Sequence, residues 1–90
     1  MPSRDVAIAS AVGLHARPAN LFVTQVASLG IPVTIAKQGG RAVDARSMLG
    51  VMTLGAKQGD VVTLAANGDG AEAALDTLVA FLSIDHDAPA

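Results

Sequence analysis

The sequence predicts an α+β fold in which helices cover one face of a small sheet. Short stretches that alternate Val, Ile or Leu with small or polar residues, such as 6–9 and 62–64, are typical of half-buried strands. Longer stretches with apolar residues at helical spacing lie between these predicted strands or after the last of them. The predicted order is β-α-β-β-α-β-α, which is related to the split βαβ arrangement. Because only one face of each strand carries the large aliphatic residues, we expect helices on one side only.

The first strand is predicted over about 4–9, and residues 10–14 form the loop after it. A helix should run from about Ala16 to Ser28 or Leu29, because Pro18 fits a first turn and Gly30 is the expected stop residue. Its apolar stripe is made of Ala19, Phe22, Val23, Val26 and Ala27.

A second strand over 31–36, a glycine turn at 38–40 and a short returning strand over 41–43 should follow. A short helix is predicted over about 47–53, and a strand over about 60–66.

The last helix should start at a capping box made by Asp69 and Glu72. Its apolar face is predicted to contain Ala71, Ala74, Leu75, Leu78, Phe81 and Leu82. Residues 84–90 are expected to fray, with 85–90 as a tail.

Composition narrows the class of protein. Ninety residues are expected to form one domain, residues 1–90, and a net charge of −2 argues against a nucleic-acid partner. The chain contains no cysteine, which excludes disulfides and thiolate metal sites. No apolar run resembles a signal peptide or a membrane span, so we expect a cytoplasmic protein without membrane insertion, by default a monomer.

Residues 13–20, Gly-Leu-His-Ala-Arg-Pro-Ala-Asn, form the most informative segment. His15 is predicted at the N-cap of the first helix, where free amides around Ala16, Arg17 and Pro18 favour an anion. Arg17 adds a fork of donors suited to phosphate oxygens. These features indicate a phosphorylatable imidazole, although a lone histidine at this position is more often a surface cap.

Two motifs resemble the HPr family of histidine-containing phosphocarriers of the bacterial sugar phosphotransferase system. Residues 13–19 are similar to the family's active-site signature, and residues 43–54 resemble its regulatory-serine segment. The resemblance implies a four-stranded antiparallel sheet with three helices on one face, an open-faced β-sandwich. It further implies that His15 Nδ1 accepts a phosphoryl group from Enzyme I, with Arg17 as phosphate stabiliser, and passes it to sugar-specific IIA proteins or domains.

Such a protein is a phosphoryl carrier rather than an enzyme, and no cofactor or metal is expected. Val12 departs from the family, which often has a polar residue there, so a side-chain hydrogen bond to the histidine is not expected from it. Ser47 has two interpretations, a simple N-cap of the short helix or a regulatory site for an HPr kinase/phosphorylase. The family more often has Lys where this chain has Arg46.

A docking patch for partners is predicted around His15, made of Leu21, Met48, Leu49 and Met52. The short helix is apolar nearly all round, and one turn or two on a one-sided sheet cannot bury every side. Val51 and Leu54 are expected to face the core. The alternative is that the methionines only complete the core.

Other functions remain as alternatives. The chain could be a carrier of the nitrogen-related branch, or a regulatory binding module in which His15 transfers no phosphate. A hydrolase is disfavoured, because no second catalytic side chain lies near His15 in the sequence. Asp85-His86-Asp87 resembles a metal site, but a solvated tail is the preferred interpretation.

Overall fold

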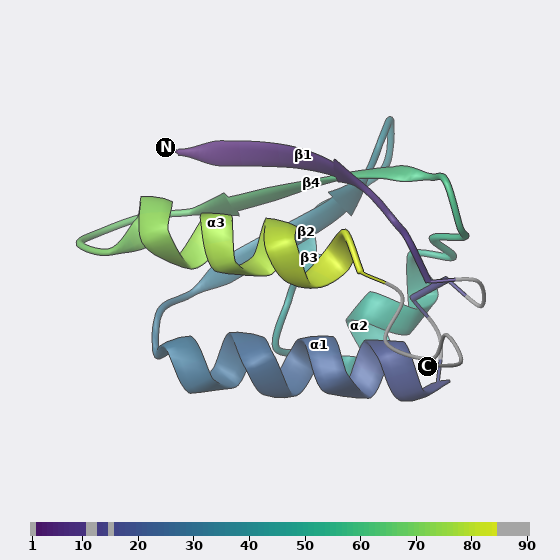
Figure 1. Cartoon of the computed structure of the whole chain (residues 1–90), viewed down its shortest axis with the longest axis horizontal. Coiled ribbons are helices and arrows are strands. Elements are labelled where there is room, and N and C mark those ends of the chain that lie inside the picture. Colours follow the sequence, from purple (N-terminus) through teal and green to yellow (C-terminus); the bar gives the residue numbers. More distant parts are fainter. Residues whose placement is uncertain (1, 11–12, 15, 85–90) are drawn as a thin grey trace.

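The structure is a computed structural model that describes residues 2–10, 13–14 and 16–84. The elements, in chain order, are β1 (Ser3–Ala7), α1 (Ala16–Leu29), β2 (Val33–Lys37), β3 (Val43–Asp44), α2 (Met48–Thr53), β4 (Val61–Ala66) and α3 (Ala71–Leu82) (Figure 1). This is the predicted order of strands and helices, and α1 begins and ends where the sequence indicated.

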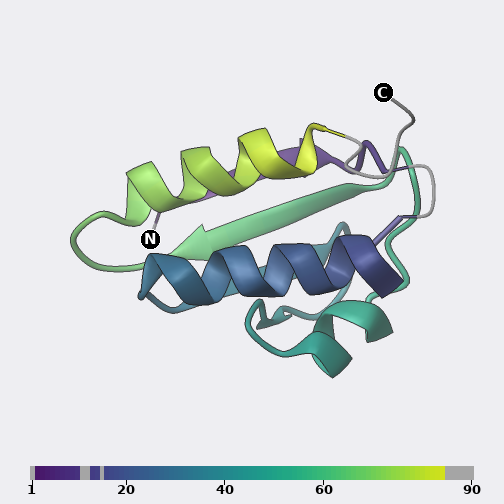
Figure 2. The same ribbon diagram turned by 60° about the horizontal axis from the view of Figure 1, so that its bottom comes forward.

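The four strands form one antiparallel sheet in the order β1-β4-β2-β3. Side chains alternate along β4, where Val62 and Leu64 are buried and Thr63 is only half-buried. The three helices lie on the side of the buried residues, with α1 and α3 side by side and α2 beside the first half of α1 (Figures 1 and 2). The predicted open-faced sandwich is therefore confirmed.

The core lies between the sheet and the helices. Phe22 of α1, Ile35 and Leu64 of the sheet, and Leu75 and Leu78 of α3 are completely buried. Each such side chain stabilises the fold by about 1.5–3 kcal/mol through removal of apolar area from water. This core holds the start of α1 at one edge of the molecule.

Strand β1 ends at Ala7, two residues before its predicted end. The Ile8 amide donates to Asp60 O at 2.9 Å, and the Ala9 amide donates to Leu82 O at 3.1 Å. Ile8 thus still pairs with the residue before β4, and the Ala9 amide is the first to bond to α3 instead of to the sheet.

The hairpin strands are shifted from their predicted bounds. β2 begins at Val33 rather than at residue 31, and the returning strand β3 is Val43–Asp44 rather than 41–43. The Gly40 amide donates to Lys37 O at 2.7 Å, which closes the turn before β3 can pair. β4 begins at Val61, one residue later than predicted.

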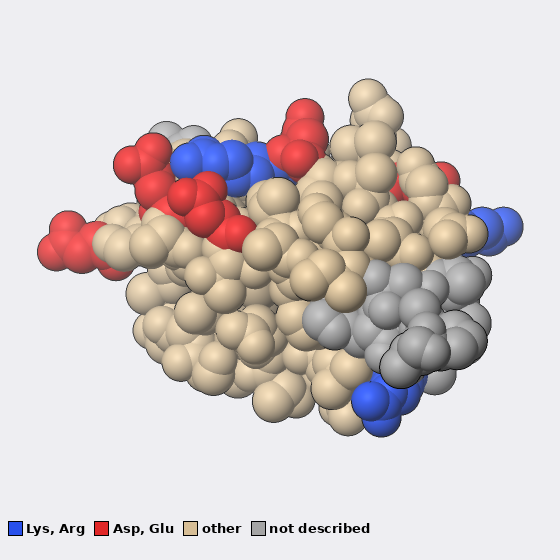
Figure 3. Space-filling view, viewed as in Figure 1, with Lys and Arg blue, Asp and Glu red and all other residues tan. Residues whose placement is uncertain are grey.

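The predicted capping box of α3 is wrong. The N-cap is Gly70, with φ +82°, and it makes no side-chain cap hydrogen bond. Glu72 Oε1 instead lies 3.6 Å from Arg4 Nη2 of β1. Arg4 Nε also lies 3.4 Å from Asp76 Oδ1. Figure 3 shows acidic and basic side chains gathered over the start of α3.

The apolar face of α3 is as predicted except for one residue. Phe81 is half-buried, although its ring lies 6.3 Å from that of Phe22. Ile84 is 57% exposed, and residues 85–90 lie outside the described residues, so the predicted fraying of the tail stays a prediction.

Candidate functional site

Helix α1 begins at Ala16, directly after His15. Within its first turn, Arg17 is exposed, whereas Pro18 and Ala19 are buried. Pro18 needs no hydrogen-bond acceptor at this position, and neighbouring first-turn amides point out of the helix. His15 and Val12 lie outside the described residues, so the predicted N-cap role of His15 stays a prediction.

The chain just before His15 is held against a loop that the sequence did not link to it. The Leu14 amide donates to Ala56 O at 2.9 Å, and the Leu14 side chain is buried. Gly13 has φ +72°, and a Cβ there would overlap Ala56 O and lie 2.9 Å from Lys57 Cα. Only glycine fits this close approach, which fixes the backbone leading into α1.

The supporting loop is itself tied down by Asp60. Asp60 Oδ2 accepts a hydrogen bond from the Lys57 amide at 2.9 Å and lies 3.3 Å from Lys37 Nζ. The hydrogen bond from Lys57, followed by that from Lys37, holds the pKa of Asp60 below its ordinary value. The sequence Lys-Gln-Gly-Asp at 57–60 is typical of a turn. The contact of this loop with Gly13 joins residues more than 40 positions apart, so residue spacing in the sequence could not reveal it.

Ser47 is the N-cap of α2, as predicted. Its backbone is extended (φ −90°, ψ 110°), and its exposed side-chain Oγ accepts from the Gly50 amide at 3.0 Å. Upstream, Asp44 Oδ1 accepts from the Arg46 amide at 2.9 Å and lies 3.5 Å from Arg46 Nε. The hydrogen bond from the Arg46 amide is the main cause that lowers the pKa of Asp44.

The four residues of the predicted docking patch differ in exposure. Leu49 is 75% exposed, whereas Leu21, Met48 and Met52 are half-buried, and both methionines pack partly against the core. The two helices that carry these residues are in contact. Val51 is fully buried and Leu54 half-buried against the core, as expected.

Neither a metal nor a membrane site is found in the described part of the chain. Its Asp and Glu residues form no group of three suited to a metal ion. None of its helices has the length and hydropathy needed to cross a bilayer. Asp85, His86 and Asp87 lie outside the described residues.

The sequence matches the family described as PTS HPr component phosphorylation site over residues 2–83. It is 51% identical over 78 residues to phosphocarrier protein HPr of Streptomyces coelicolor, covering 87% of this chain and 84% of that protein.

Solved structures agree with this match. HPr from Thermoanaerobacter tengcongensis superposes with a TM-score of 0.84 at 39% identity over 91% of each chain. The dimeric form of HPr from the same organism superposes with a TM-score of 0.66 at 40% identity, over 89% of this chain and 91% of that one. The fold, the motif at 13–19 and these matches agree: the chain belongs to the HPr family of phosphocarrier proteins.

Proposed function

We propose that this chain carries a phosphoryl group on His15 from phosphorylated Enzyme I to IIA proteins or domains, in the cytoplasm, and so supports sugar uptake. The observation that carries the proposal is the start of α1 immediately after His15, with Arg17 exposed in the first turn. Amides at a helix N-terminus and a guanidinium both favour a phosphate group.

In the proposed step, the lone pair of the neutral His15 Nδ1 attacks the phosphorus held by a histidine of Enzyme I. A new N–P bond forms on His15 while the N–P bond on Enzyme I breaks, and that electron pair returns to the Enzyme I imidazole. The backbone N–H groups of Ala16 and Arg17 in the first turn, together with the Arg17 guanidinium, offset the charge of the transferred group. A helix terminus contributes about 0.3–1 kcal/mol to such stabilisation, which is weak enough to let the phosphate leave again.

Partners are proposed to dock on Leu21, Met48, Leu49 and Met52. The contact between α1 and α2 supports one continuous patch, and Leu49 exposes a large apolar side chain with no core role. Much of the surface over α1 seen in Figure 3 is uncharged. Methionine adapts to different partner surfaces, which suits a carrier that must meet both Enzyme I and IIA components.

Ser47 is proposed as a regulatory site for a serine kinase. Ser47 is exposed, and it lies directly before Met48 and two residues before Leu49, both proposed docking residues. A phosphate there would keep oxygen acceptors for the Gly50 amide while adding up to about two negative charges. Those charges would oppose apolar docking and reduce transfer.

Phosphorylation by Enzyme I tests the proposal. The chain contains two histidines, so His86→Ala is the matched control for His15→Ala. With Enzyme I and radiolabelled phosphoenolpyruvate, the wild-type chain and His86→Ala should both acquire an acid-labile label, and His15→Ala should acquire none. Label retained by His15→Ala would overturn the assignment of the phosphorylated residue.

A further inference from the structure

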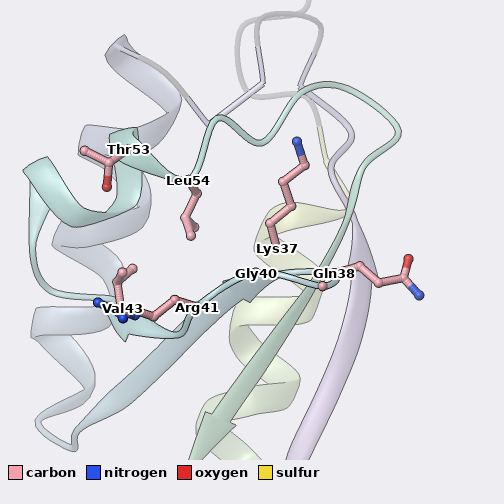
Figure 4. Close-up of a pocket in the computed structure, with 8 residues that line it drawn as sticks. Lys37, Gln38, Gly40, Arg41, Val43, Thr53 and Leu54 are labelled. Atoms are coloured by element: carbon pink, nitrogen blue, oxygen red, sulfur yellow. The ribbon is translucent and has the colours of Figure 1, made fainter.

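A pocket of about 510 Å³ opens between the β2–β3 hairpin and the end of α2 (Figure 4). Residues 37–41 of the hairpin, Val43, Thr53 and Leu54 line it. It shares no residue with the segment 13–20 or with the proposed docking patch. Its volume lies within the range of small-molecule sites, about 300–1,000 Å³.

The pocket is basic although the chain as a whole carries a net charge of −2. Lys37 and Arg41 line it, and its lining contains no acidic residue. Figure 4 shows Lys37 on one side, Arg41 beside Val43 on the other, and Leu54 extending into the space between them. The two cations therefore flank an apolar surface.

The two cations are not equivalent. Lys37 Nζ lies 3.3 Å from Asp60 Oδ2 and 3.5 Å from Gly55 O, so its charge is partly offset, but one of its three donors remains. The exposed Arg41 guanidinium makes no ion pair or side-chain hydrogen bond with any of residues 2–10, 13–14 and 16–84. Arg41 would therefore supply the attraction for an anion, whereas the Lys37 ammonium points away from Arg41 on the other side of Leu54 (Figure 4).

We infer that this pocket binds a small phosphate ester, with the phosphate at Arg41 and the carbon skeleton against Leu54 and Val43. The Arg41 guanidinium favours a phosphate over a single carboxylate, because its fork of donors matches phosphate oxygens and no lining residue is acidic. The half-buried Leu54 and Val43 favour an ester over free phosphate, since inorganic phosphate would leave this apolar surface uncovered.

An NMR titration of the ¹⁵N-labelled chain with glycerol 3-phosphate tests the inference, with glycerol and inorganic phosphate as comparison ligands. We expect saturable amide shifts at Gly39, Gly40, Arg41 and Thr53 with the ester, weaker binding of inorganic phosphate, and none of glycerol. Arg41→Gln should weaken binding of the ester about tenfold or more, the usual effect of losing a charged hydrogen-bond partner. Arg4→Gln, which removes an arginine of β1 paired with α3, should leave it unchanged.

Three outcomes would overturn the inference: no saturable shift in the hairpin, equal affinity in Arg41→Gln, or shifts confined to residues 13–20. Urea unfolding of Arg41→Gln checks that its fold is intact. Arg41→Gln should still be phosphorylated by Enzyme I at the wild-type rate, so failure of this site and failure of the carrier function can be told apart.

Discussion

Replacing Gly13 with alanine should destabilise the chain more than replacing Gly30, although both glycines have nearly the same backbone conformation. Their φ angles are +72° and +74°. An added Cβ at Gly13 would meet the backbone of Ala56 and Lys57, whereas one at Gly30 would meet nothing within 4 Å. Gly30→Ala is thus a control for the conformational cost alone.

The magnitude follows from these contacts. A left-handed backbone costs an L-residue about 1–2 kcal/mol, and this cost applies to both variants. Gly13→Ala must also move the loop away from Ala56, which sacrifices the 2.9 Å hydrogen bond of Leu14, worth about 0.5–1.5 kcal/mol. We expect a loss of about 1.5–3.5 kcal/mol for Gly13→Ala and about 1–2 kcal/mol for Gly30→Ala.

Urea unfolding of both variants, followed by circular dichroism, measures the difference in the free energy of unfolding. The stabilisation that alanine gains from a less flexible unfolded chain is common to both and cancels. Equal losses in the two variants would refute the claim that the 56–57 loop fixes the backbone before His15. Enzyme I should also phosphorylate Gly13→Ala more slowly than Gly30→Ala.

Three further predictions concern the cap, the docking patch and Asp60. Ser47→Ala should lower the free energy of unfolding by about 1 kcal/mol, because it removes the acceptor that caps the Gly50 amide. Ser47→Asp should keep most of this stabilisation, because a carboxylate can also cap the amide. Chemical denaturation measures both variants, and equal losses would contradict the capping role. Leu49→Ser should change the free energy of unfolding by less than about 0.5 kcal/mol, because the Leu49 side chain is 75% exposed. The same substitution should raise the KM of Enzyme I for this chain. An unchanged KM would show that Leu49 is not part of the docking patch. The pKa of Asp60 lies below its ordinary value of 3.8 in the folded chain, so its contribution to stability is present above that value and is lost as pH falls through the folded pKa. Asp60→Asn should therefore lose less stability than wild type on acidification below about pH 4, and a parallel decline of both proteins would argue against this assignment.

The elements that sequence analysis placed well are those whose signals are local. Pro18, the apolar stripe and Gly30 all agree on the bounds of α1, and Ser47 stands where its hydroxyl caps α2. The start of α3 was misassigned, because Gly70 takes the N-cap and Glu72 pairs with Arg4 from β1. Such a long-range ion pair leaves no mark in the local pattern.

In the candidate site, too, the features found from the sequence are local, and those not found depend on contacts between distant residues. The motif at 13–19 is contiguous, so it could be found from the sequence, and the family match over residues 2–83 includes it. The support of Gly13 by Ala56 and Lys57 could not be found, because it depends on how two distant loops meet. The basic pocket was missed for the same reason, since Arg41 and Leu54 come from different elements.

The most direct test of the carrier function is onward transfer. The chain labelled on His15 should be separated from Enzyme I and mixed with a purified IIA protein in the absence of phosphoenolpyruvate. We expect the label to move to IIA and His15 to return to its unphosphorylated state, ready for a second cycle. Label that stays on the chain, or is released only as inorganic phosphate, with a IIA protein that accepts phosphate from another HPr, would contradict it.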